Sequence, residues 1–350
     1  MTHIVHQLAD LTAQRDHHSL DSVLLSTLHD LLNPTRVTIA QLVGQAGREH
    51  WLTCADMHNG VAQPTDTEAR AELEALPQAD AFSRRQLALS GRQPVLSADP
   101  GGISVFPLVR PGGPPAVLEL CTAGLLPGEH VRLITGVLRL YQNFQNLLDY
   151  GERDALTELL NRKTFDGAFL KATTEQQLMH DRANEDRRRP SADATHLTTG
   201  GGYWLALLDI DHFKQVNDNF GHLIGDEVLL LLARLMRNTF RFHDQLYRFG
   251  GEEFVVLMHS CSGLQTLAAL QRLRSNTEEY PFPQVGRITV SIGYTELRRG
   301  DTPSGAFERA DKAVYYAKKH GRNQVCGFED LMAQGKIAPE PTNVGEIELF

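Results

Sequence analysis

An apolar run in the C-terminal half of the chain ends in acidic residues. The run Tyr203 to Leu208 leads directly into Asp209 and Asp211, a pattern typical of a buried strand that delivers carboxylates to the edge of a sheet. If the strand stays extended, the two aspartates point to the same side. Oxygen donors of this kind suit Mg²⁺ or Mn²⁺ rather than zinc. The alternative is an ordinary solvated strand end.

A pair of glycines separates two strand-like runs in the segment RFGGEEF at 248–254. Gly250 and Gly251 predict a tight hairpin in which a ligand can approach the backbone closely. Two carboxylates directly after this turn, Glu252 and Glu253, are unfavourable unless a positive group lies beside them. A metal ion bound to a triphosphate would be such a group, and Glu252 can share that metal with Asp209 on a neighbouring strand.

Two further positions can recognise a nucleotide base. Asp226 stands at the end of the glycine-flanked segment GHLIGD, and its carboxylate can accept two hydrogen bonds from the N1–H and amino group of guanine. Asn217 offers both a donor and an acceptor. The alternative for Asp226 is that it caps the helix that begins there.

Lys318 and Arg322 are four residues apart near the end of the last predicted helix. If that helix extends far enough, both side chains lie on one face and can hold phosphates. The alternative is that they only complement the negative end of the helix dipole.

Helices and strands alternate around these residues. The pattern predicts helices over 165–178, 225–240, 264–279 and 303–320, and strands over 203–210, on both sides of Gly250-Gly251 and over 287–294. This order predicts an α+β fold with a helix-covered antiparallel sheet of the palm or ferredoxin-like kind over 153–328. The polar stretch 173–202 is expected to be an inserted loop, and the tail 329–350 to be weakly ordered.

The N-terminal part, 1–128, is predicted to be a separate mixed α/β domain. An amphipathic helix over 19–32 stops at Asn33-Pro34, and strands follow over 37–43, 51–55, 103–109 and 116–121. A helical stretch over 68–89, broken at Pro77, lies between the second and third strands.

A linker helix over 129–152 is predicted to join the two domains. Its apolar residues repeat with the spacing 4-3-4-3, the seam of a coiled coil, and these residues are Leu133, Val137, Leu140, Phe144 and Leu147. The pattern favours a parallel dimer stalk that holds two C-terminal domains side by side. The alternative is a helix packed on its own domain.

Composition restricts the class of protein. The 350 residues predict two domains and carry a net charge of -9, which argues against general nucleic-acid binding. No apolar run approaches the roughly 20 residues that a membrane span needs. The first residues, 1–11, do not resemble a signal peptide. The four cysteines are far apart, so we expect neither a zinc ribbon nor a disulfide framework, and a cytoplasmic location.

Together, several motifs in order resemble the GGDEF family of diguanylate cyclases over about 152–327. They are DALTELLNR at 154–162, LDIDHFKQVND at 208–218, FGHLIGD at 220–226, RFGGEEF at 248–254, SIG at 291–293 and ADKAVYYAKKHGRN at 310–323. The signature here reads Gly-Gly-Glu-Glu-Phe rather than Gly-Gly-Asp-Glu-Phe, which retains the carboxylate.

The resemblance implies that two GTP molecules condense to cyclic di-GMP with release of pyrophosphate. It implies a metal held by Asp209, the Ile210 carbonyl, Glu252 and Glu253, and catalytic roles for Glu252, Glu253 and Lys214. The implied substrate-binding residues are Asn217, His222, Asp226, Phe213, Gly250, Gly251, Lys318 and Arg322. Each domain holds one GTP, so the reaction needs two domains facing each other in a homodimer.

Arg241 to Asp244 fit the family's RxxD motif, which implies inhibition by the product cyclic di-GMP with a secondary contact from Arg272. The N-terminal domain resembles a GAF-type sensory domain, with a PAS-like domain as the alternative, and it would regulate the cyclase in response to an unknown small molecule or protein. Two other readings remain at this point: an inactive GGDEF domain that serves as a nucleotide receptor, and a different nucleotidyl cyclase or palm-type polymerase. No Glu-Ala-Leu phosphodiesterase motif is present.

Overall fold

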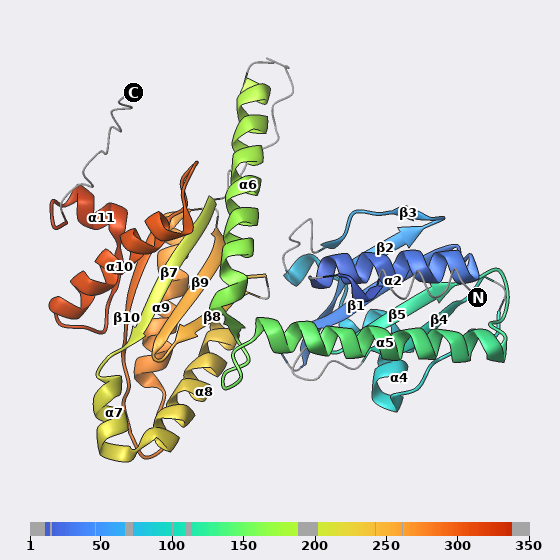
Figure 1. Ribbon diagram of the computed structural model, residues 1–350, viewed down its shortest axis with the longest axis horizontal. Coiled ribbons are helices and arrows are strands. Elements are labelled where there is room, and N and C mark those ends of the chain that lie inside the picture. Colours follow the sequence, from blue (N-terminus) through green and yellow to red (C-terminus); the bar gives the residue numbers. More distant parts are fainter. Residues whose placement is uncertain are drawn as a thin grey trace, which may run out of the picture. The chain divides into compact units, whose positions relative to one another are not determined.

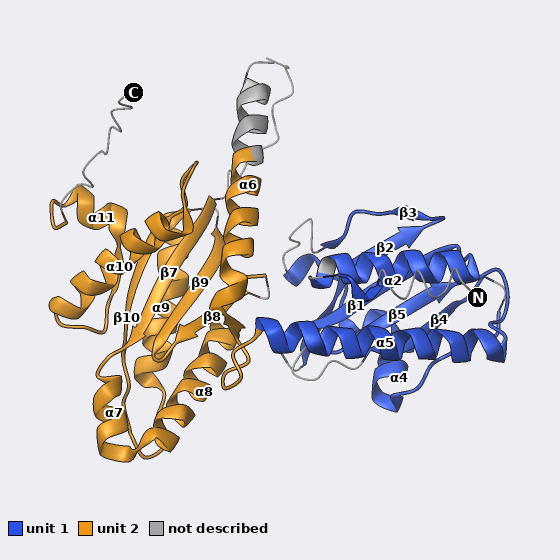
Figure 2. Cartoon of the chain, in the orientation of Figure 1, with its two compact units in different colours: residues 1–152 blue, residues 153–350 orange. Residues whose placement is uncertain are grey.

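A computed structural model of the chain describes residues 11–337 apart from 15, 46, 67–72, 100, 109–113, 188–201, 242 and 261. The chain divides into two compact units, residues 1–152 and residues 153–350 (Figure 2). The predicted linker helix is not a separate element in this division, because all of it belongs to the first unit. No helix in the described part of the chain combines the length and the hydropathy that crossing a bilayer requires.

The first unit is a five-stranded antiparallel sheet with helices on both faces (Figure 1). Its strand order is β3-β2-β1-β5-β4. The elements are α2 (His17–Leu32), β1 (Arg36–Gln45), β2 (Arg48–His58), β3 (Val61–Ala62), the 3-10 turns η1 (Leu73–Ala75) and η2 (Ala79–Ala81), α4 (Ser83–Gly91), β4 (Ile103–Leu108), β5 (Ala116–Cys121) and α5 (Gly128–Glu152).

Alternation along the strands sends apolar side chains to both faces of this sheet. Ile39 and Leu118 pack into the core formed with α2 and α5, whereas Trp51 and Val105 pack with Ala88 of α4 on the opposite face. The four predicted strands and the first helix are confirmed. The helical stretch predicted over 68–89 is wrong in part: its described residues form two 3-10 turns and the short helix α4, because Pro77 and the following polar residues interrupt it.

Helix α5 packs on its own domain, with a face that only partly overlaps the predicted seam. Its buried residues are Ile134, Val137, Leu138, Tyr141 and Gln145. Of the predicted seam only Val137 is among them, and Leu140 and Leu147 are 43% and 65% exposed. The 4-3-4 spacing of Ile134, Leu138, Tyr141 and Gln145 matches the 3.6-residue helix period equally well. The core of the first unit is centred on this face; Leu133 and Phe144 of the predicted seam pack against it, and Leu140 and Leu147 stay exposed.

Polar residues fix how α5 lies against α2. The hydroxyl of Tyr141 donates a hydrogen bond to Asp21 of α2, and Nε2 of Gln145 donates to the Tyr141 oxygen at 2.6 Å. All three residues are at least 95% buried. Buried hydrogen bonds between two helices oppose sliding, because any shift would leave these groups without partners.

The second unit is a six-stranded sheet between two pairs of helices (Figure 1). Its elements are β6 (Leu160–Asn161), α6 (Arg162–Arg187), β7 (Gly202–Ile210), α7 (Phe213–Phe220), α8 (His222–Thr239), β8 (Gln245–Gly250), β9 (Glu253–Ser260), α9 (Gly263–Glu279), β10 (Val290–Glu296), α10 (Pro303–Lys319), β11 (Val325–Gly327) and α11 (Phe328–Ala333). Helices α8 and α9 pack on one face, and α6 and α10 pack on the other.

The strand order is β11-β10-β7-β9-β8-β6. The α+β class is confirmed, and the central strands β10, β7, β9 and β8 are antiparallel as predicted. The sheet as a whole is mixed, however, because the short edge strands β11 and β6 run parallel to their neighbours. Edge strands of two or three residues carry too short a pattern to be found by alternation.

Three sequence predictions for this unit need correction. Helix α6 continues to Arg187, so the loop predicted to begin at Thr173 is helical until that point; the rest of that loop, 188–201, lies outside the described residues. Helix α7, which is short and mostly polar, was not predicted. The predicted tail begins with α11, whose Leu331 is 5% exposed and packs on α10, and residues 338–350 lie outside the description.

Candidate active site

The carboxyl end of β7 places Asp209 at the centre of the sheet. Along β7, Leu205 and Leu207 face the α6–α10 side, so alternation places Asp209 on that side too. In the register of the sheet, Asp209 stands opposite Glu253 of β9 and Ser291 of β10. Burial raises the pKa of Asp209, and Asp211 and Asp311 raise it further, although the Lys318 ammonium opposes the shift. A carboxylate in this position gains from a nearby cation.

Lys318 supplies a cation at this position. Its Nζ lies 2.7 Å from Oδ2 of Asp209. Helix α10 can come this close to the sheet because Gly293 of β10 has no side chain: a Cβ there would lie 2.3 Å from the Ala310 carbonyl oxygen. The SIG motif therefore has a packing role that brings α10 to the strand bearing Asp209.

Arg322 does not share a helix face with Lys318, so that expectation is wrong. Helix α10 ends at Lys319, and Arg322 lies in the following turn in a left-handed conformation, with φ at 62°. Its backbone N–H donates to the Ala317 carbonyl at 3.0 Å, which ends the helix. Any role of Arg322 toward phosphates therefore depends on how this turn is held.

The predicted glycine hairpin joins β8 to β9. Gly250 and Gly251 have φ values of 146° and 52°, which side chains rarely tolerate. Arg248 steadies the turn by donating through Nε and Nη2 to the Gly251 carbonyl at 3.1 and 2.9 Å. Its Nη1 donates to Oδ1 of Asp154 at 3.0 Å. Burial alone would raise the pKa of Asp154, but hydrogen bonds from Thr157 and Arg248 lower it.

Glu252 and Glu253 differ in their surroundings. Glu252 is half-buried, and burial together with the Asp209 carboxylate raises its pKa. Glu253 is exposed. Within the described part of the chain, no three His, Cys, Asp or Glu side chains are arranged as a ready metal site. The chemistry of the donors still fits a hard divalent cation, because Asp209 and Glu252 are oxygen ligands with raised pKa values and an ammonium already neutralises one of them.

Asn217 and Asp226 come from neighbouring helices, α7 and α8, that meet at Gly225. A Cβ at Gly225 would lie 1.9 Å from Oδ1 of Asn217, so the glycine makes room for the amide side chain. Asp226 is exposed. The helix begins at His222, so Asp226 lies too far inside it to be its N-cap, and the capping alternative is wrong.

At the start of α7, Phe213 is buried and Lys214 is exposed. The Phe213 side chain is 5% exposed and belongs to the core, which leaves its backbone as the part able to contact a ligand. Lys214 is exposed. His222, at the first position of α8, is also exposed.

The RxxD residues lie between α8 and β8, and the described part of this motif is engaged within the chain. The Arg241 N–H donates to Oδ2 of Asp244 at 2.9 Å. Burial raises the pKa of Asp244 to about 6. Arg272 of α9 donates through Nη2 to the Thr239 carbonyl at 2.8 Å. Phe242 lies outside the described residues.

The position of Asp211 and its hydrogen-bond partners differ clearly from the sequence expectation. Strand β7 ends at Ile210, so alternation no longer holds at Asp211. Its carboxylate accepts hydrogen bonds from Thr289, Ser291 and the backbone of Asn323. Sequence reasoning paired Asp211 with Asp209 and gave Asn323 no role, although both residues stand inside recognised motifs.

Comparison with known proteins identifies the domain that carries this site. Residues 191–324 match the family described as "Diguanylate cyclase, GGDEF domain", so the second unit contains a GGDEF domain. The chain is 46% identical over 129 residues to diguanylate cyclase DgcP of Pseudomonas aeruginosa, covering 36% of this chain and 19% of that protein. It is 43% identical over 137 residues to the response regulator PleD of Caulobacter vibrioides, covering 37% and 30%.

Among solved structures, the coiled coil and GGDEF domain of DgcB from Caulobacter crescentus, in complex with c-di-GMP, matches 57% of this chain and 100% of that one. The identity is 29% and the TM-score is 0.46. The chain spans less than a third of the length of DgcP and of PleD.

Proposed function

We propose that this protein is a diguanylate cyclase that condenses two GTP molecules into cyclic di-GMP and two pyrophosphates. The observation that carries the proposal is the Asp209 carboxylate at the end of β7, opposite the glycine hairpin of a GGDEF domain and paired with Lys318. A phosphoryl-transfer site needs this combination of carboxylates for a metal and cations for phosphates.

Asp209, the Ile210 carbonyl and Glu252 would hold a divalent cation, Mg²⁺ or Mn²⁺, with Glu253 contributing to a second. The side chain of Ile210 contains no oxygen, so its backbone carbonyl is the group that could serve as a ligand. The bound metal would neutralise charge on the triphosphate and lower the pKa of the attacking hydroxyl. The raised pKa values of Asp209 and Glu252 support this assignment, because burial and neighbouring carboxylates disfavour the charged form of both groups and a bound cation would offset this.

Asn217 and Asp226 would bind the guanine edge, with His222 beside them. The close approach of α7 and α8 at Gly225 supports a shared site for both side chains. Gly250 and Gly251 leave room for the nucleotide next to the hairpin. The phosphates would contact the backbone at Phe213 and the cations Lys214, Lys318 and Arg322.

Each 3′-hydroxyl would attack the α-phosphorus of the facing GTP in line with the departing pyrophosphate. Glu252 would accept the hydroxyl proton, directly or through a water molecule, with Glu253 beside it. Lys214 would stabilise charge on the phosphates during transfer. Since each GGDEF domain holds one GTP, the ring closes only between two domains, and the active species is a homodimer.

The first unit would bring the two catalytic domains together and regulate them. Leu140, Leu147 and Tyr150 of α5 are 43%, 65% and 87% exposed, so this face remains free for a second copy of the helix. We assign the unit to the GAF-like or PAS-like sensory domains, which respond to a small molecule or a protein. A GTP-consuming enzyme of this kind would act in the cytoplasm.

The RxxD residues Arg241 and Asp244, with Arg272, would bind cyclic di-GMP and inhibit the enzyme. Arg241 is exposed, and a guanidinium is the group that binds guanine edges and phosphates through paired hydrogen bonds.

The test is incubation of the full chain, freed of bound cyclic di-GMP, with GTP and Mg²⁺, followed by chromatography. We expect cyclic di-GMP and pyrophosphate in a ratio of one to two. Glu252→Ala should abolish turnover because it removes a metal ligand and the base. Glu308→Gln is the matched control, since Glu308 is exposed and forms an ion pair with Lys312 one turn further along α10. Near-normal turnover by Glu252→Ala, or no product from the unmodified chain, would contradict the proposal.

A further inference from the structure

Asp211 lies in the turn between β7 and α7 and is 5% exposed. Its Oδ2 accepts hydrogen bonds from the Thr289 hydroxyl at 2.7 Å and from the Asn323 N–H at 3.0 Å. Its Oδ1 accepts one from the Ser291 hydroxyl at 2.7 Å. Both carboxylate oxygens are therefore satisfied within the protein, and neither is left over for a ligand.

These hydrogen bonds join three segments that contribute to the candidate site. Asp211 is two residues after Asp209, and α7 begins two residues later at Phe213. Ser291 of β10 stands opposite Asp209 in the sheet. Asn323 directly follows Arg322. One buried side chain thus connects the strand end, the start of α7 and the turn that carries Arg322.

The turn after α10 needs such an attachment. Arg322 and Asn323 have φ values of 62° and 46°, and two successive left-handed residues other than glycine are unfavourable. The turn is held on two sides, because the Asn323 N–H binds Asp211 and Oδ1 of Asn323 accepts a hydrogen bond from Nη1 of Arg274 at 2.9 Å. These two contacts add to the hydrogen bond from the Arg322 N–H to the Ala317 carbonyl, and they attach the turn to the segments around it.

We propose that Asp211 is a positioning residue, which through Asn323 and β10 fixes the Arg322 turn relative to the start of α7 so that both contact one triphosphate. The inference rests on the proposed function, because the triphosphate is that of GTP. Asp211 itself touches neither metal nor nucleotide in this role.

The role requires hydrogen bonds rather than negative charge. Two of the three donors are hydroxyl groups, which can rotate and accept instead of donating. An asparagine at 211 can accept from Thr289 and the Asn323 N–H through its carbonyl and donate to Ser291 through its amide. Asp211→Asn should therefore preserve the site, whereas Asp211→Ala should release the turn.

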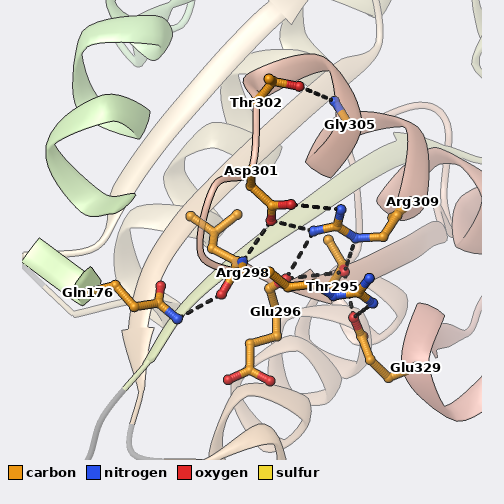
Figure 3. A network of polar contacts seen from close by, with 10 residues as sticks. Gln176, Thr295, Glu296, Arg298, Asp301, Thr302, Gly305, Arg309 and Glu329 are labelled. Atoms are coloured by element: carbon orange, nitrogen blue, oxygen red, sulfur yellow. Dashed lines mark hydrogen bonds and ion pairs between the residues drawn. The ribbon is translucent and has the colours of Figure 1, made fainter. Parts of the chain in front are cut away.

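A matched control exists at the other end of β10. Asp301 is also a well-satisfied carboxylate: Arg309, itself 3% exposed, donates to it through Nη1 at 3.1 Å and Nη2 at 2.5 Å (Figure 3). The Arg298 N–H donates to it at 2.6 Å. This network lies beyond Glu296, whereas Asp211 lies beside Val290 at the start of the strand. Asp301→Ala removes a comparable anchor away from the candidate phosphate site.

The test compares two ligands that cannot cyclise, 3′-deoxy-GTP with Mg²⁺ and 3′-deoxyguanosine, whose affinities for the full chain are measured by calorimetry. Asp211→Ala should bind the triphosphate about tenfold more weakly, because the hydrogen bonds that hold the Arg322 turn are lost, and bind the nucleoside as the unmodified chain does. Asp211→Asn should stay within about threefold of the unmodified chain for both ligands. Asp301→Ala should change neither affinity.

Several outcomes would overturn the inference: unchanged triphosphate affinity in Asp211→Ala, equal loss of both ligands, or a loss in Asp211→Asn as large as in Asp211→Ala. If the unmodified chain does not bind the triphosphate, the proposed function itself fails. If Asp211→Ala does not fold, Thr289→Val removes one donor with little change of shape, and it should give a smaller loss that is still restricted to the triphosphate.

Discussion

The ammonium of Lys318 lies 2.7 Å from Oδ2 of Asp209, so the lysine that the family resemblance assigns to phosphates is the counterion of the proposed metal ligand. The side chain of Lys318 is 34% exposed and that of Asp209 is 13% exposed. A metal and a triphosphate would divide this pair between them, the metal taking the carboxylate and the phosphates taking the ammonium. Metal binding without nucleotide must therefore compete with Lys318.

Lys318→Met should consequently have opposite effects on the two ligands. We expect Mn²⁺ in the absence of nucleotide to bind more tightly, by about threefold or more, and 3′-deoxy-GTP to bind about tenfold more weakly. Mn²⁺ affinity can be followed by electron paramagnetic resonance of the free ion. Lys319→Met is the control, because the Lys319 ammonium lies over the Tyr315 ring, 5.4 Å from its centre. Weaker Mn²⁺ binding in Lys318→Met would show that the lysine does not compete with the metal.

Leu147→Glu tests the proposed dimer. Leu147 is 65% exposed in the single chain, so the charge should leave the fold of the first unit intact but oppose pairing of two α5 helices. We expect a shift from dimer to monomer in light scattering, with turnover lost at low protein concentration and partly recovered at high concentration. Leu170→Glu on α6, at a position 67% exposed, should affect neither property. A dimer unchanged by Leu147→Glu would place the interface elsewhere.

Arg241→Ala tests product inhibition. Arg241 is exposed, and the hydrogen bond to Asp244 comes from its backbone, so the substitution keeps this hydrogen bond of the local turn. Initial rates measured against added cyclic di-GMP should show inhibition reduced by tenfold or more, about the loss of one charged contact, with a similar rate in its absence. Inhibition that persists at the original product concentration would mean that the RxxD segment has only a structural role.

The raised pKa of Asp244 predicts that the stability of the second unit depends on pH. Its pKa is raised from 3.8 to about 6 by burial, so the folded state favours the protonated form. Stability from this group is fully present below pH 3.8 and is lost as pH rises to 6. The pKa of Asp244 is about two units higher in the folded than in the unfolded state. Burying the charged carboxylate at neutral pH therefore lowers the free energy of unfolding by at most ~3 kcal/mol.

Asp244→Asn can still accept the Arg241 N–H and carries no charge to bury. It should raise the unfolding temperature of the second unit at pH 7.5, and this gain should largely disappear near pH 4. Thermal unfolding at both pH values measures the effect. An equal gain at the two pH values would contradict a raised pKa as its cause.

Local patterns in the sequence determined the elements that carry most of the candidate site. Apolar runs and the glycine pair identified β7, β8 and β9, because alternation and turn chemistry act over a few neighbouring residues. Asp209 was therefore assigned correctly to a strand end and Glu252 to a hairpin, and Asp226 was assigned to the helix α8, whose start at His222 lies earlier than expected. Short or polar elements such as α7, β6 and β11 were not predicted, because their sequence patterns are too short to be distinguished from those of loops.

Tertiary structure alone decided which partners those residues meet. The alternation rule placed Asp209 and Asp211 together, but the strand ends between them, and the sheet neighbour β10 then takes the Asp211 carboxylate. Helix periodicity placed Arg322 with Lys318, but the helix ends first. On α5, two apolar faces were compatible with the sequence, and the core of the first unit selected Ile134 and Tyr141. Such choices depend on contacts between residues far apart in the chain, which no local spacing encodes.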